Sequence, residues 1–118
     1  IEELFINSAL SLSEIIFARN QDSSKNIGDK LSLQFSANEI NVLYIDFLRE
    51  ILFQVNTNFR YFYKIEINIF SNNKISMDCF YHILDIENVT QEIKAVTYHN
   101  IEINKEKDFY SALVTFDI

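Results

Sequence analysis

The chain has 118 residues, 48% of them hydrophobic, and a formal net charge of −7 at pH 7. This length fits one domain with its own core, so we assign residues 1–118 to a single domain. The negative charge argues against direct nucleic-acid binding, which requires a basic surface. The sequence contains one cysteine, Cys79, and no apolar run of ~20 residues. We therefore expect a cytoplasmic protein that does not contact a membrane. We also expect a monomer or a weak homo-oligomer.

The first predicted element is a helix over residues 1–19. Its apolar residues share one stripe: Leu4, Phe5, Ala9, Leu12, Ile15 and Ile16. Acidic residues favour the first turn of a helix, yet no capping residue precedes Glu2 and Glu3. We therefore expect the sequence to be an N-terminally truncated fragment.

A strand and a second helix follow. Residues 30–35 alternate between apolar and polar side chains, as a half-buried strand does. The run from Ser36 to Glu39 matches a capping box and predicts a helix that ends near Gln54. Its predicted apolar face consists of Ile40, Leu43, Tyr44, Phe47, Leu48, Ile51 and Leu52.

Four strands complete the chain, predicted over residues 59–70, 74–83, 95–103 and 109–118. Asparagine takes the role of glycine and proline in the turns, at residues 56–58 and 72–73. In residues 59–70, strict alternation places Tyr63, Ile65, Ile67 and Ile69 on one face. The order of elements predicts an α+β fold with two helices packed on a mainly antiparallel β-sheet.

Common catalytic signatures are absent from this sequence. It contains no phosphate-binding glycine loop, no zinc-type spacing of Cys and His, and no serine nucleophile elbow. Carboxylates are abundant, so a hard cation such as Ca²⁺ or Mg²⁺ is the plausible metal.

Lys94 and His99 are the first candidate site residues. Both lie in the run from Lys94 to His99, at the start of a predicted strand. Their offset of five places them on opposite faces unless the strand is bulged. Lys94 also fits a solvated strand-end cation, and His99 fits a hydrogen-bonded or half-buried histidine.

Asp117 is the second candidate, at the end of the last predicted strand. If Ile118 ends the natural chain, its carboxylate adds a second anion beside Asp117. Two carboxylates and a main-chain carbonyl begin a hard-cation site. The alternative is a surface aspartate on a frayed strand end.

Asp46 is a further candidate, because it lies beside core positions on the second predicted helix. Arg49, three residues later, makes a surface ion pair the more ordinary interpretation. Cys79 and His82, also three apart, point to opposite faces of a strand, which argues against a Cys–His dyad.

These segments resemble the archease family. The resemblance is strongest over residues 92–103, where the sequence Lys-Ala-Val-Thr-Tyr-His begins at Lys94. The ending at Asp117 and Ile118 resembles the family's terminal strand, and residues 43–52 and 1–5 resemble its helices. At residues 82–83 the chain has His-Ile where the family usually has Gly-Glu.

The resemblance implies a function. Archease promotes guanylylation and turnover of an RtcB-type RNA ligase in tRNA splicing and RNA repair, as a protein cofactor or chaperone and not as an enzyme. It also implies a divalent-cation site, typically for Ca²⁺, with Asp117 and Ile118 as ligands here. A second Asp ligand would come from a strand upstream of Ile1. Lys94, His99 and Asp46 are then the expected partner-contacting residues, and the RNA ligase protein is the expected partner.

Two other functions stay open. One is a divergent interaction or scaffold domain that keeps the archease fold without activating a ligase. The other is a metal-dependent hydrolase, although no cluster of acids with a suitable base accompanies Asp117 in the sequence.

Overall fold

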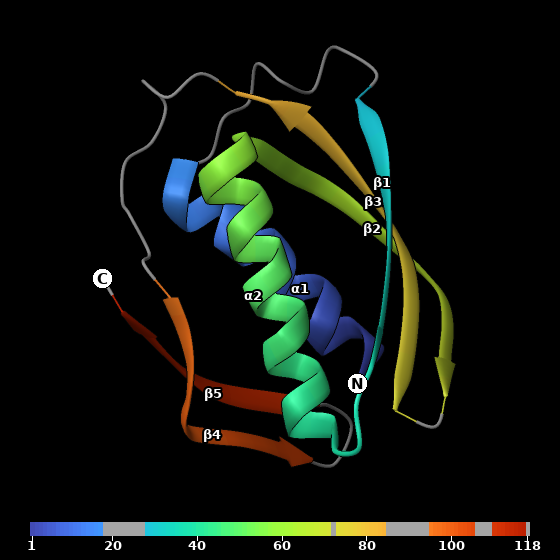
Figure 1. Cartoon of the computed structure of the whole chain (residues 1–118), viewed down its shortest axis with the longest axis vertical. Helices are drawn as coiled ribbons and strands as arrows, with labels where there is room; N and C mark the ends of the chain where they lie inside the picture. Colours follow the sequence, from blue (N-terminus) through green and yellow to red (C-terminus); the bar gives the residue numbers. More distant parts are fainter. Residues whose placement is uncertain (18–27, 72, 85–94, 106–109, 118) are drawn as a thin grey trace.

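The computed structural model describes residues 1–17, 28–71, 73–84, 95–105 and 110–117, without the side chains of residues 95–102, 113 and 115–117. Its elements, shown in Figure 1, are α1 (Glu2–Phe17), β1 (Asp29–Ser36), α2 (Ile40–Asn58), β2 (Arg60–Ser71), β3 (Lys74–Ile83), β4 (Ala95–Lys105) and β5 (Tyr110–Asp117). The predicted order of one helix, one strand, one helix and four strands is confirmed. Within these ranges, no helix is long and apolar enough to cross a membrane.

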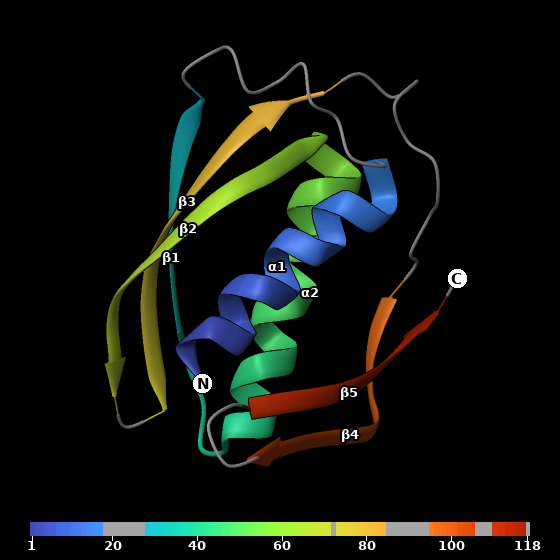
Figure 2. The same ribbon diagram turned by 180° about the vertical axis from the view of Figure 1, so that it is seen from behind.

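The strands form two antiparallel sheets. One has three strands in the order β1-β3-β2, and the other is the hairpin β4-β5, which we call the small sheet. Figure 2 shows both helices between these two sheets. The predicted α+β class and the antiparallel pairing are confirmed, and the structure divides the strands that we expected in one sheet.

The core lies where the two helices meet the three-stranded sheet. Phe5 of α1 is fully buried, with its ring centroid 5.1 Å from that of Tyr44, 5.3 Å from Phe47 and 5.5 Å from Phe70. Full burial of each such side chain contributes roughly 1.5–3 kcal/mol. On β3, the alternating residues Ile75, Met77, Cys79 and Tyr81 are all buried, as their spacing predicts.

The predicted alternation of β2 is wrong, because its pairing with β3 shifts register at two places, between Phe62 and Lys64 and between Ile67 and Ile69. Each shift reverses which residues face the helices. Tyr63 and Ile69 are consequently 40% and 57% exposed, although Ile65 is buried. Beside the first shift, the main-chain N–H of Phe62 donates a 3.0 Å hydrogen bond to the buried hydroxyl of Ser13.

The predicted capping box is also wrong. Ser36 is the last residue of β1, α2 begins at Ile40, and the side chain of Glu39 makes no capping hydrogen bond. Tertiary contacts with the β2–β3 turn replace it: Ala37 N–H donates to the main-chain oxygen of Asn73 at 3.1 Å, and Asn73 Nδ2 donates to that of Asn38 at 3.0 Å. Asn73 adopts a left-handed conformation, consistent with the predicted hairpin turn.

Helix α2 runs four residues past its predicted end, so residues 56–58 form its last turn and not a connecting turn. Gln54 links this turn to β2. Its Oε1 accepts hydrogen bonds from Asn58 Nδ2 at 2.9 Å and from the Arg60 guanidinium at 2.6 Å, while its Nε2 donates to Glu50 at 3.0 Å. Phe59 then ends the helix in a left-handed conformation with φ 54°.

Candidate functional site

The small sheet brings the two parts of the predicted site to one end. Ala95, which follows Lys94 in the sequence, pairs with Asp117, and Val96 pairs with Phe116. In Figure 1, the beginning of β4 and the end of β5 accordingly lie side by side, near the C-terminus. Lys94 and Ile118 themselves fall outside the described residues.

The register of the small sheet breaks at the segment that contains His99. Thr97 pairs with Thr115 and Glu102 with Leu113, so five steps along β4 match two steps along β5. Strict alternation therefore does not hold between Thr97 and Glu102. Because Lys94 lies outside the described residues, the relative faces of Lys94 and His99 stay a prediction. The orientation of the His99 side chain lies outside the description.

The donor groups at this end of the sheet fit part of a hard-cation site. In its sequence, this end offers the Asp117 carboxylate, whose placement lies outside the description, and main-chain carbonyl oxygens, both donor types that Ca²⁺ accepts. Ca²⁺ takes roughly six to eight oxygen ligands, so a complete site would also need water or a further carboxylate. Among the described side chains, no group of three His, Cys, Asp or Glu residues could hold a metal ion.

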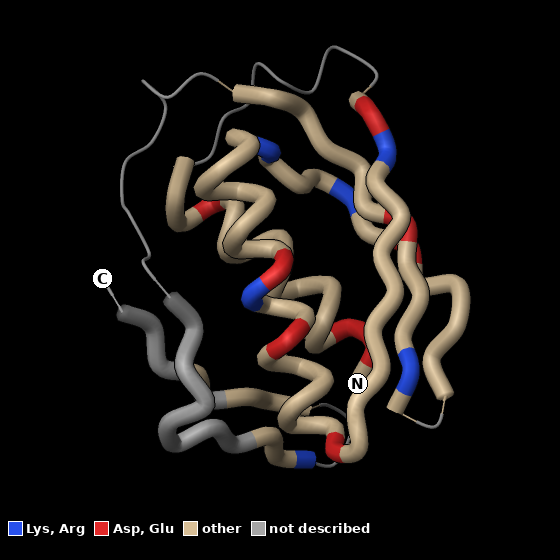
Figure 3. The backbone as a smooth tube through the Cα atoms, viewed as in Figure 1, with Lys and Arg blue, Asp and Glu red and all other residues tan. Residues whose placement is uncertain are grey.

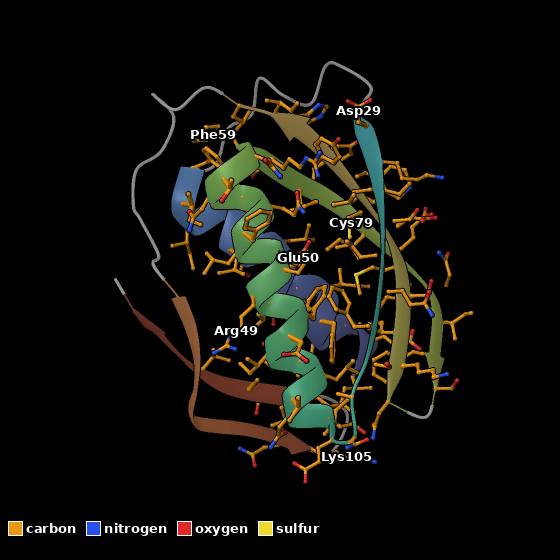
Figure 4. All side chains as sticks on the ribbon, viewed as in Figure 1. Asp29, Arg49, Glu50, Phe59, Cys79 and Lys105 are labelled. Atoms are coloured by element: carbon orange, nitrogen blue, oxygen red, sulfur yellow. The ribbon has the colours of Figure 1, made fainter. Side chains whose placement is uncertain are left out.

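Asp46 lies on α2, the helix that packs against β4. Its side chain is half-buried, and both Asp46 and Arg49 interact with their surroundings. Figure 4 shows Arg49 pointing away from the three-stranded sheet. The partner-contacting role of Asp46 stays a prediction.

Cys79 and His82 lie on opposite faces of β3, so the exclusion of a dyad is confirmed. Cys79 is fully buried on the face of β3 that carries the core residues (Figure 4), and burial, with a smaller contribution from Asp78, raises the pKa of its thiol to about 12. His82 is half-exposed and stacks on Tyr63 with ring centroids 4.5 Å apart. The thiol therefore packs in the core and is not suited to act as a nucleophile.

A pocket of about 340 Å³, which we call the α1–β5 pocket, was not predicted from the sequence. It is lined by Asn7, Ser8, Ser11, Leu12 and Ile15 of α1, Tyr44 and Leu48 of α2, and Ala112 and Val114 of β5. In its wall, the Tyr44 hydroxyl lies 2.5 Å from Ser8 Oγ, which donates to the main-chain oxygen of Leu4 at 2.7 Å. Burial raises the pKa of Tyr44, and its hydrogen bond with Ser8 opposes that rise. The sequence signal was the pair of small residues, Ser8 and Ser11, beside the apolar face of α1.

Charge differs between the helices and the three-stranded sheet, as Figure 3 shows. The helices carry five acidic residues, three in α1 and two in α2, and one basic residue, Arg49. Strands β1, β2 and β3 carry three acidic and four basic residues. Of these described elements, the helical layer is therefore the negatively charged one.

Comparisons with known proteins indicate one family and one fold. A model of the Archease protein family (MTH1598/TM1083) matches residues 1–118. Protein archease of Methanosarcina barkeri (strain Fusaro / DSM 804) is 31% identical over 124 residues, which cover 99% of this chain and 82% of that protein. The solution structure of Methanobacterium thermoautotrophicum protein 1598 superimposes with a TM-score of 0.73 at 24% identity, covering 99% of this chain and 84% of that one.

Proposed function

The chain belongs to the archease family, and on that premise we propose that it is a non-enzymatic protein cofactor of an RtcB-type RNA ligase. In this role it promotes guanylylation and repeated turnover of the ligase during tRNA splicing and RNA repair in the cytoplasm. The ligase carries out the chemistry, and this protein acts on the ligase without binding RNA directly.

The pairing of Ala95 with Asp117 is the observation that supports this proposal most directly. It brings the strand that follows Lys94 alongside the strand that ends at Asp117, so the two family-like segments meet at one end of the small sheet. A compact contact surface built from both segments suits action on a protein partner.

A divalent cation, Ca²⁺ in the first instance, is part of the proposal. The Asp117 carboxylate and the main-chain oxygen of Ile118 would hold it, together with oxygens from water or an additional carboxylate. A bound cation would supply positive charge at the end of the small sheet and orient these oxygens. Removal of Asp117 should therefore weaken cation binding.

The acidic helices also suit a basic protein partner. Complementary charge steers the encounter between two proteins and discourages wrong partners. Because α1 and α2 carry five of the acidic residues, the helical layer would attract a basic surface of the ligase.

The test is a guanylylation assay with a purified RtcB-type ligase, GTP and metal ion. We expect the full-length protein, at an amount below that of the ligase, to increase the initial rate of ligase guanylylation and the number of RNA joining cycles. An equal amount of an unrelated acidic protein serves as the control. Equal rates with and without the protein would contradict the proposal.

A scaffold domain that does not activate a ligase is the second candidate function, since the same fold and negative charge would also suit a scaffold. Calcium titration of the full-length protein separates the two candidates. Binding that depends on Asp117 supports the cofactor function, and absence of any Ca²⁺ binding favours the scaffold.

A further inference from the structure

The two edge strands of the three-stranded sheet differ in how they resist pairing with another chain. Strand β2 shifts register twice, and its exposed Lys64 and Glu66 form an ion pair with 3.0 Å between Nζ and Oε1. Register shifts and charges disrupt an edge, which otherwise offers main-chain N–H and C=O groups to a further strand. Strand β1 pairs with β3 without a shift, and its charged residues, Asp29 and Lys30, are its first two. Of these two edges, β1 is therefore the one suited to accept another strand.

The side of β1 that faces the helices carries an apolar row that is incompletely covered. Leu31, Leu33 and Phe35 alternate along it, and all three are half-buried. Their pairing partners on β3 are fully buried. The difference arises because β3 has a strand on both sides, whereas β1 has one on a single side among the described elements. A strand added to β1 would therefore bury apolar surface as well as form main-chain hydrogen bonds.

The outer edge of β1 lies away from the small sheet, because both helices lie between the two sheets (Figure 2). A strand upstream of Ile1 that brings a second Asp to Asp117 would lie at the small sheet. Such a strand would leave the edge of β1 open.

The sequence of β1 is complementary to itself in one antiparallel register. With Leu33 opposite its own copy, apolar residues meet apolar ones and polar residues meet polar ones; the pairs are Leu31 with Phe35, Ser32 with Gln34, and Lys30 with Ser36. The two copies of Lys30 lie at opposite ends, so no charge faces a like charge. A register that is symmetric about one residue is what a two-fold axis between identical chains requires.

We propose that two copies of this chain pair antiparallel through β1, centred on Leu33, and so join their three-stranded sheets into one. A second copy is the occupant because this register completes both edges at once and sets no like charges opposite each other. Each copy has a net charge of −7, so repulsion between the copies opposes the pairing and keeps it weak at low salt. The pairing does not depend on the proposed function.

Sedimentation of the full-length protein tests the pairing in the presence of any segment upstream of Ile1. We expect a dimer whose population rises with protein concentration and is larger in ~0.5 M than in ~0.05 M NaCl. A protein that stays monomeric at ~1 mM in both salt concentrations overturns the proposal.

Leu33→Lys and Ile67→Lys are a matched pair of variants that locate the interface. Both residues are half-buried and both pair with Met77, Leu33 from β1 and Ile67 from β2. In the proposed dimer, Leu33→Lys sets two lysines opposite each other and removes apolar contact. We expect at least tenfold weaker association, with Ile67→Lys within about twofold of wild type. Equal weakening by both variants, or none by Leu33→Lys, overturns the proposal.

Disulfide cross-linking tests the register and does not rely on the folding of the lysine variants. Leu33→Cys faces its own copy in the proposed dimer, with about 4.5–5.5 Å between Cα atoms, a separation that a disulfide spans. Gln34→Cys is the control, because it faces Ser32 of the second copy; both variants are made in a Cys79→Val background. With diamide as oxidant, we expect Leu33→Cys to form the linked dimer at least tenfold faster than the control. Equal rates of cross-linking contradict the pairing about Leu33.

Discussion

The three-stranded sheet and the small sheet share one chain but differ in construction. Strand β1 pairs with β3 over eight consecutive positions without a break, and the core side chains of β3 are buried against the helices. Among the described residues, the small sheet has two strands, and its pairing breaks between Thr97 and Glu102. A two-stranded sheet is marginally stable without packing against other elements.

The residues that stabilise the fold therefore lie in a different region from the candidate site. The described core is built from α1, α2 and the three-stranded sheet, and the described side chains of the small sheet contribute only partly buried neighbours such as Ile103 and Val114. The family-like segments instead meet at an end of the small sheet. Substitutions in the first region should therefore change folding stability, and those at Asp117 should change binding.

The largest effect should come from Phe5→Ala in the core. Phe5 is fully buried among three aromatic rings, so its truncation should cost about 3–5 kcal/mol of unfolding free energy. Phe53→Ala is the control, because Phe53 on α2 is 51% exposed and should lose less than about 1 kcal/mol. Urea unfolding measures both, and similar losses would refute this placement of the core.

Alkaline pH should destabilise the same region through Cys79. Burial raises the pKa of its thiol from 9.0 to about 12, so the folded state favours the protonated form. The stability from this preference is complete below pH 9 and is lost as pH rises toward 12, approaching about 4 kcal/mol in total.

Unfolding free energies of the wild type and Cys79→Val between pH 8 and about 11 would measure this loss. Tyr44, whose pKa is also raised, titrates in both proteins, so the difference between them reports the thiol. Parallel pH profiles of the two proteins would contradict the assignment to Cys79.

A smaller effect should follow from Ser13→Ala. The Ser13 hydroxyl accepts the main-chain N–H of Phe62 beside the register shift of β2, and its loss leaves that buried N–H without this partner. We expect a loss of about 1–3 kcal/mol. Ser11→Ala, at an exposed position of the same helix, should change stability by less than about 0.5 kcal/mol, and an equal effect of both would refute the role of this hydrogen bond.

Periodicity predicted the order of the elements because the helices and strands have long apolar patterns. Strand β3 follows strict alternation, and its predicted bounds, residues 74–83, are those of the structure. The same rule failed on β2, where each register shift depends on β3 and on helix contacts such as Ser13 with Phe62. The local sequence of β2 does not indicate those partners.

The same limit applies to helix ends and to the site. The motif at Ser36 looked like a cap, but hydrogen bonds to Asn73, far along the chain, hold residues 37–38 outside the helix. Sequence named Lys94 and Asp117 from their strand positions and from a resemblance, and it predicted a hairpin of the last two strands. The structure shows the register of that hairpin, in which Ala95 pairs with Asp117. The α1–β5 pocket depends on three elements at once, so no single pattern could reveal it.

Asp117→Ala should have the smallest effect on folding. Asp117 ends β5, so its truncation should change the unfolding free energy in metal-free buffer by less than about 0.5 kcal/mol. Calcium affinity should fall at the same time, because the variant lacks a carboxylate ligand. A large loss of thermal stability in metal-free buffer would contradict the separation of stability from the site.

The initial rate of ligase guanylylation with Asp117→Ala, relative to wild type, tests the central claim most directly. We expect the wild type to accelerate guanylylation, and the variant, folded and equally stable, to lose most of that acceleration. Acceleration by the variant equal to that of the wild type would contradict the assignment of function to this end of the small sheet.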